Sequence, residues 1–134
     1  MLKDIPDHKV EDVAMAIVPE ISPEGDKVWN VYVVNMKNET IEGVLVTSRG
    51  YGHHKGERVK TSTLRHFIDT VPAQGFARVE PIIENLFGLN NEYWLSFYVK
   101  RDIYDKKYLF LPETINEEYF TTIPVLGKMG VMII

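Results

Sequence analysis

Short stretches in which apolar and polar residues alternate run along almost the whole chain, and this period of two predicts β-strands. Residues 28–36, VWNVYVVNM, carry β-branched or aromatic side chains on both faces, which is typical of a strand in the middle of a sheet. A short polar turn separates them from residues 41–48, so we expect the two segments to form a β-hairpin. Residues 90–112 predict a second, longer hairpin.

Further strands are predicted on either side of these hairpins. Residues 11–21 predict a first strand, and residues 75–82 predict a strand that ends near a proline. Strands spaced about ten residues apart, with Pro and Gly between them, are typical of an antiparallel sandwich. The order of strands and turns over residues 28–81 is similar to that of small bacterial immunoglobulin-like domains. We therefore expect an all-β fold: a single antiparallel β-sandwich domain over residues 1–134, immunoglobulin-like, with seven to nine strands.

Residues 57–71 fit two kinds of element. Leu64, Phe67, Ile68 and Val71 have the spacing of an amphipathic helix, and a Thr or Ser before them is available as an N-cap. The Gly-rich loop that precedes the segment resembles the tip of a hairpin and favours a strand instead. The sequence leaves strand and helix open for residues 61–71.

The C-terminal segment is unusually apolar for a chain end. It finishes with Val131, Met132, Ile133 and Ile134, whereas disordered tails are mostly polar. One interpretation is a last strand that packs within the sandwich. The other is a segment that adds to a partner chain, because exposed apolar area of this kind marks interaction surfaces.

Composition limits the classes of function. Of 134 residues, 45% are hydrophobic and 25% are charged, the values of an ordinary soluble globular protein. With no cysteine, the chain has no disulfide, thiolate zinc site or cysteine nucleophile, which suits a reducing cytoplasmic compartment. The N-terminus lacks the pattern of a signal peptide, and no segment has the length of a membrane span. The net charge of -4 argues against general binding of nucleic acid.

Histidines and basic residues gather around the sequence YGHHKGER, residues 51–58. Neutral imidazoles are common ligands of Zn²⁺ and Ni²⁺, but adjacent residues of a strand point to opposite sides, and no familiar metal-binding histidine spacing occurs. A dinucleotide or P-loop site is not indicated, because no strand-loop-helix unit surrounds the glycines. A local basic face that meets a phosphate or an acidic partner stays open beside a solvated hairpin tip. The candidate basic and histidine loop comprises His53, His54, Lys55, Arg58, Arg65 and His66.

Signals for catalysis are weak. Ser48, Ser62 and Ser96 lack the G-x-S-x-G setting of an activated serine. Paired carboxylates such as Glu80 and Glu84 do not by their spacing alone establish a glycosidase cleft. We predict no catalytic residue, no metal and no cofactor.

Aromatic residues concentrate in the hairpin of residues 90–112. Alternation places Trp94 and Tyr98 on the more polar face, together with Ser96 and Lys100, so we expect these two rings in an exposed patch. The candidate interaction surface comprises Trp94, Tyr98, Val131, Met132, Ile133 and Ile134.

The chain also resembles a small bacterial family, in which the pieces MLKDIP, HKVEDVAMAIVPE, VKTSTLRHF, LNNEYWLSFY and FTTIPVLGKMGVMI recur. Some members carry the label of a phenylalanyl-tRNA synthetase subunit. A class II synthetase core is much longer than 134 residues, so the resemblance implies a family without a demonstrated activity.

These observations favour a non-enzymatic cytosolic binding or assembly module that contacts a protein partner or forms a homo-oligomer. One alternative is a metal- or ligand-binding protein or enzyme that uses the region of His53, His54 and His66. Another is an accessory of translation with a weak RNA contact through the basic hairpin. A membrane role is not expected, and nucleic acid is a less favoured partner than protein.

Overall fold

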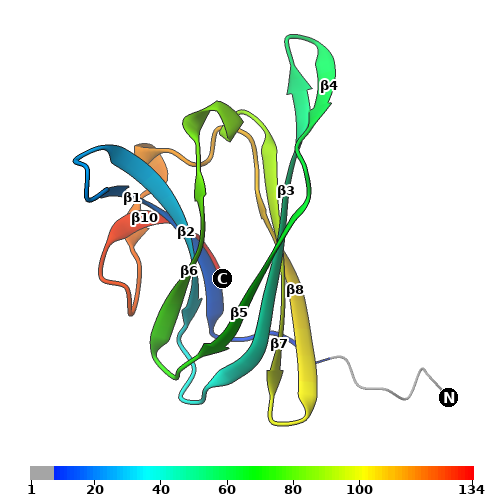
Figure 1. Ribbon diagram of the computed structural model, residues 1–134, viewed down its shortest axis with the longest axis vertical. Helices are drawn as coiled ribbons and strands as arrows, with labels where there is room; N and C mark the ends of the chain where they lie inside the picture. The colour runs from blue at the N-terminus through cyan, green and yellow to red at the C-terminus, as the bar shows by residue number, and fades with distance from the viewer. Residues whose placement is uncertain (1–7) are drawn as a thin grey trace, which may run out of the picture.

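The computed structural model describes residues 8–134, which form ten β-strands and two short 3₁₀-helices and contain no α-helix (Figure 1). The strands are β1 (Val13–Ile21), β2 (Lys27–Asn35), β3 (Ile41–His54), β4 (Glu57–Lys60), β5 (Leu64–Val71), β6 (Gly75–Ile82), β7 (Asn90–Val99), β8 (Asp102–Phe110), β9 (Thr121–Thr122) and β10 (Met129–Ile133). The 3₁₀-helices are η2 (Glu84–Leu86) and η3 (Glu117–Tyr119). The prediction about a signal peptide falls partly on residues 1–7, which lie outside the described residues.

Two antiparallel sheets face each other across one hydrophobic core (Figure 1). The first sheet has the order β6-β2-β1-β10-β9. The second has the order β4-β3-β7-β8, and β5 also pairs with β3, along its first half. The predicted all-β antiparallel sandwich is confirmed. The described residues form ten strands, one more than the upper limit of the predicted seven to nine. The number is higher because β4 and β9, of four and two residues, are separate short strands. No helix in this part of the chain has the length and apolarity to cross a membrane.

Alternate residues of the strands point into the space between the two sheets and fill the core. Val13, Met15 and Ile17 of β1 point inward and are almost completely buried, and they face Leu95 and Phe97 of β7 across the sandwich. Burial of each such side chain contributes roughly 1.5–3 kcal/mol. A direct bond also joins the sheets, because the buried hydroxyl of Tyr108 on β8 donates to the Val13 carbonyl at 2.6 Å.

The predicted hairpin between residues 28–36 and 41–48 is wrong. β2 pairs with β1 and β6 in the first sheet, whereas β3 pairs with β4, β5 and β7 in the second. The chain between β2 and β3 therefore crosses from one sheet to the other. The long hairpin predicted for residues 90–112 is confirmed as β7 and β8, with Asn91 opposite Phe110.

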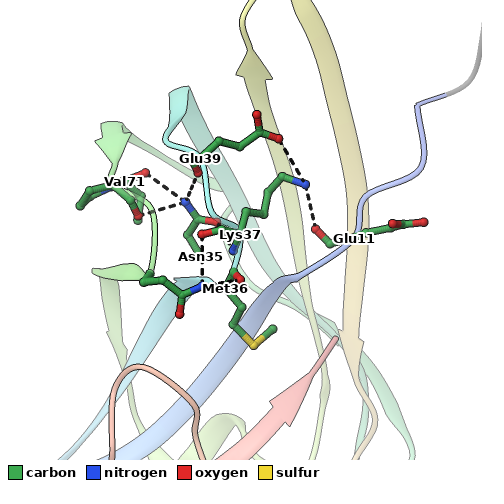
Figure 2. A network of polar contacts seen from close by, with 8 residues as sticks. Glu11, Asn35, Met36, Lys37, Glu39 and Val71 are labelled. Carbon is green, nitrogen blue, oxygen red and sulfur yellow. Dashed lines mark hydrogen bonds and ion pairs between the residues drawn. The ribbon is translucent and has the colours of Figure 1, made fainter.

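A buried asparagine at the end of β2 holds this crossover (Figure 2). The Asn35 amide nitrogen donates to the carbonyls of Glu39 at 3.0 Å, Pro72 at 3.0 Å and Val71 at 3.3 Å. Its oxygen accepts from the Lys37 backbone N–H at 3.0 Å. The amide therefore joins the β2–β3 crossover to the turn after β5, which satisfies backbone groups that an irregular loop leaves unpaired.

The open choice for residues 61–71 is decided in favour of a strand. β5 pairs with β3 from Ser48 opposite Leu64 to Ile41 opposite Val71. The helix alternative is wrong, although the strand is interrupted before Leu64. There the Thr61 hydroxyl accepts from the Gly50 N–H at 2.7 Å, and the Thr61 N–H donates to the Gly50 carbonyl at 2.8 Å.

The C-terminal segment packs within the sandwich. β10 pairs with β1, and the loop before it lays Ile123 and Leu126 over the outward side chains of β1. The residues that this loop covers are Ala14, Ala16 and Val18, all fully buried. β1 is consequently enclosed on both faces.

Candidate binding face

The outer surface of the second sheet is built from the outward side chains of four strands. Cross-strand pairing aligns them in rows: Glu42 with Tyr98 and Ile103, Phe67 with Leu45, Ser96 and Asp105, Arg65 with Thr47, Trp94 and Lys107, and Arg49 with Glu92 and Leu109. Neighbours in each strand, such as Leu95 and Phe97, point into the core. We call this surface the open face.

Large apolar side chains lie exposed on the open face. Phe67 is 68% exposed, Ile103 54%, and Trp94 and Tyr98 44% each. The predicted exposure of Trp94 and Tyr98 is confirmed. Phe67 and Ile103 were not predicted as part of the patch. They lie on β5 and β8, and only the pairing register of these strands shows that both residues are next to Trp94 and Tyr98. The patch thus spans three strands instead of one.

A glycine makes room for one of these rings. Gly43 has a φ of +57° at an irregularity in the pairing of β3, and a Cβ atom there would lie 3.1 Å from Cδ2 of the Tyr98 ring. A left-handed backbone with this contact favours glycine over any other residue. Gly43 therefore leaves room for the Tyr98 ring beside β3.

The outer surface of the first sheet differs, because the chain itself covers its β1 side, although Phe76 of β6 is 46% exposed at the far edge. Beside Ile123 and Leu126, the Lys128 ammonium contacts Glu20, which also accepts from the Tyr32 hydroxyl at 2.6 Å. Burial alone would raise the pKa of Glu20, but hydrogen bonds from Lys128, Tyr32 and Asn30 outweigh it and lower the pKa. Burial and the bond to Glu20 raise the pKa of Tyr32 to about 12.

Cations flank the aromatic patch. The Lys107 ammonium lies 5.9 Å from the centre of the Trp94 ring, within the range of a cation–π contact. Arg49 donates to Glu92 at 2.8 Å, and this hydrogen bond raises the pKa of the Arg49 guanidinium. Arg65, from the predicted basic loop, lies on the open face opposite Thr47. Among residues 8–134 it makes no ion pair.

The open face continues into the hairpin of β3 and β4, which extends beyond the other strands (Figure 1). Its Tyr51 lies opposite Lys60 and its His53 opposite Arg58, so these four share one side of the ribbon. With Arg49 they line a cleft of about 820 Å³. His54 lies opposite Glu57 on the other side, and Lys55 is at the tip with a φ of +53°.

Charge is unevenly divided along the chain. Residues 49–65 hold five of the fifteen basic residues and one of the nineteen acidic residues, so their net charge is +4. The remaining residues carry -8, which restores the total of -4. The hairpin of β3 and β4, with the first residues of β5, is therefore a basic element on an acidic body.

His66 lies apart from the other two predicted histidines. It faces inward, and its Nε2 contacts Glu80 of β6 at 2.6 Å, while the Ser48 hydroxyl donates to the same carboxylate oxygen at 2.8 Å. This cluster joins the two sheets at one edge of the sandwich. Because the carboxylate stands between the hydroxyl and the imidazole, His66 is not placed to take the Ser48 proton. Within residues 8–134 no group of three His, Asp or Glu side chains could hold a metal ion.

The C-terminal part of the predicted interaction surface is divided. Val131 is 4% exposed, so its inclusion in that surface is wrong, because β10 turns this side chain into the core. Met132 and Ile133 are half-buried, and Ile134 is 60% exposed. The structure does not bring these residues into the patch of Trp94 and Tyr98, which lies on the other sheet.

Comparisons with known proteins give one family. No curated protein and no solved structure matches the chain. A family model described as Domain of unknown function (DUF4909) matches residues 30–134, from β2 to the last strand. This agrees with the expectation of a family without an assigned activity. The chain belongs to the DUF4909 family.

Proposed function

We propose that the chain is a non-enzymatic, cytosolic binding or assembly module that contacts another protein through the open face. The observation that carries the proposal is the contrast between the two outer surfaces. On the first, Ile123 and Leu126 cover the outward side chains of β1 and leave only the edge residue Phe76 as an exposed aromatic ring. On the second, Phe67, Trp94 and Tyr98 all stay uncovered. Exposed aromatic rings with cations beside them are typical of the anchoring residues of protein interfaces.

We also infer that the sandwich is immunoglobulin-like. In such domains the first two strands lie in one sheet, and the third strand pairs with the last two in the other. Here β1 pairs with β2, while β3, β7 and β8 are neighbours in the second sheet. This order supports the inference, and it makes the open face the outer surface of the β3-β7-β8 sheet.

Site-specific photo-crosslinking in cells tests the proposal. A photoreactive phenylalanine analogue at Trp94 should give adducts with a protein. The same analogue at Tyr119, which is 56% exposed on η3 and outside the open face, should give none of these adducts. Identical adducts from both positions, or none from position 94, would refute the proposed surface. An ordinary Trp94→Phe variant with an unchanged fold serves as the background control.

A second candidate function is supported by the basic hairpin. The cleft of about 820 Å³ is lined by Arg58, Lys60 and His53, and this favours an anion such as an RNA phosphate as a ligand. Binding of a labelled RNA oligonucleotide, followed by fluorescence anisotropy, should weaken steeply with added salt and in an Arg58→Ala/Lys60→Ala variant. Binding that does not respond to salt would exclude this candidate.

A further inference from the structure

We propose that the open face binds a second copy of this chain, in a symmetric dimer in which each strand faces its own counterpart with the two ends of the face exchanged. The inference rests on the proposed function, because it requires the open face to be a contact surface. It adds the identity of the occupant and the orientation in which that occupant binds.

Charges of opposite sign occupy the two halves of the face. The two rows nearest the β7–β8 turn carry Glu42 and Asp105 and no cation, a charge of -2 within these rows, and Lys100 follows them in the turn itself. The two rows at the other end carry Arg49, Arg65 and Lys107 with Glu92, a charge of +2. Apolar side chains occur in all four rows: Tyr98, Ile103, Phe67, Trp94 and Leu109. The open face is therefore neutral as a whole and opposite in sign at its ends.

A two-fold axis between the rows of Ser96 and Trp94, running across the strands, makes this pattern complementary to itself. The axis exchanges the two ends, so that Lys107 of one copy faces Asp105 of the other. It also sets Arg49 against Glu42 of the second copy. In the outermost rows of β8, Ile103 meets Leu109 of the other chain. An isologous contact of this kind forms a closed dimer.

The other face-to-face orientation is unfavourable. With the axis along the strands, each row faces its own copy and the two edges of the sheet exchange. Arg65 of one copy then lies against Lys107 of the other, and two like charges approach each other. Such a juxtaposition is repulsive, so the charges select the orientation in which each strand faces its own counterpart.

The size of the face fits a weak dimer. Four strands about 4.8 Å apart and four rows about 6.8 Å apart cover about 500 Å² in each copy. The total of about 1,000 Å² is near the lower limit for a specific interface. We therefore expect the chain to be monomeric in dilute solution and to dimerise as its concentration rises.

Charge reversal across the two-fold axis tests the inference by sedimentation velocity at rising protein concentration. The wild-type chain should shift from 15.5 kDa to twice that mass. Asp105→Lys sets lysine against Lys107 of the other copy and should raise the dissociation constant at least about tenfold. The double variant Asp105→Lys/Lys107→Glu restores opposite charges and should recover wild-type dimerisation. Asp26→Lys, the same change in the turn between β1 and β2, should have no effect.

Each outcome of this experiment supports or overturns a stated part of the inference. A wild-type chain that stays monomeric at all concentrations would overturn the inference, as would a dimer that Asp105→Lys leaves intact. Failure of rescue in the double variant would overturn the orientation in which each strand faces its own counterpart. Crosslinking from position 94 to a different protein, together with a monomeric chain, would retain the proposed binding function and reject only the second copy as its partner.

Discussion

Replacement of Asn35 by aspartate tests how the chain crosses between the sheets. The change alters one group only, because an amide nitrogen that donates becomes a carboxylate oxygen that accepts. In Figure 2 that nitrogen points at the carbonyls of Glu39 and Val71, at 3.0 and 3.3 Å. It also donates to the Pro72 carbonyl at 3.0 Å. The variant would set a buried negative charge against three oxygens.

The cost follows from the bonds that are lost. The three carbonyls share the two N–H groups of the amide, and two hydrogen bonds at about 0.5–1.5 kcal/mol each give roughly 2 kcal/mol, before any penalty for burying the charge. This is a large part of the 5–15 kcal/mol that holds a typical domain. Protonation returns one donor, so the fold should raise the pKa of the new carboxyl above the unfolded value of about 3.9. The deficit relative to wild type should therefore grow as the pH rises through and above 4.

Guanidinium unfolding at pH 7 and at pH 3.5, followed by tryptophan fluorescence, measures both effects. Asn38→Asp is the matched control, because this exposed side chain uses its oxygen to accept from Gln74 at 3.4 Å. It should unfold like the wild type. If Asn35→Asp stays within about 0.5 kcal/mol of the wild type at pH 7, or if its deficit does not change with pH, the assigned role of the amide is wrong.

Two further predictions concern the attachment of the C-terminal segment. Gly130→Ala should lower the Tm by roughly 10 °C, because the added Cβ would lie 2.5 Å from the Ile17 carbonyl oxygen and such overpacking costs about 3 kcal/mol. Gly88→Ala is the control and should leave the Tm unchanged, because its Cβ would contact only the carboxylate at the end of the Glu113 side chain. Glu20→Gln should cost about 2 kcal/mol at pH 7 by losing its charged bond to Lys128. Because the fold lowers the pKa of Glu20 from 4.5, this difference should begin to shrink as the pH falls below that value and vanish once the pH is below the lowered pKa. Acid titrations of the two proteins that never converge would contradict it.

The elements that could be predicted from the sequence are those whose partners are neighbours along the chain. β7 and β8 form a hairpin, so the alternation of apolar residues alone located both strands and also the exposure of Trp94 and Tyr98. Whether the connection between β2 and β3 is a hairpin turn or a crossover between sheets could not be predicted in this way. A short polar connection is compatible with both a hairpin and a crossing, and the deciding bonds join Asn35 to residues about 36 positions away.

The expectation of an immunoglobulin-like sandwich is itself incompatible with a hairpin between residues 28–36 and 41–48. In that architecture the second and third strands lie in opposite sheets, which excludes a hairpin between them. The residues of the candidate site also differ in whether neighbouring or distant parts of the chain decide their positions. Phe67 and Ile103 joined the patch only through the register of β5 and β8, and His66 left the predicted loop because Glu80, fourteen residues later, faces it across the sandwich edge.

The basic hairpin on an acidic body gives the molecule an electric dipole. Residues 49–65 carry +4 and the rest of the chain -8, and the hairpin extends away from the sandwich (Figure 1). At about 0.1 M salt, where charges act over roughly 10 Å, such a dipole turns an approaching molecule before the surfaces touch. Encounters would then begin in a preferred orientation. At 1 M salt this range falls to about 3 Å, and the same contacts would have to be found by random collision.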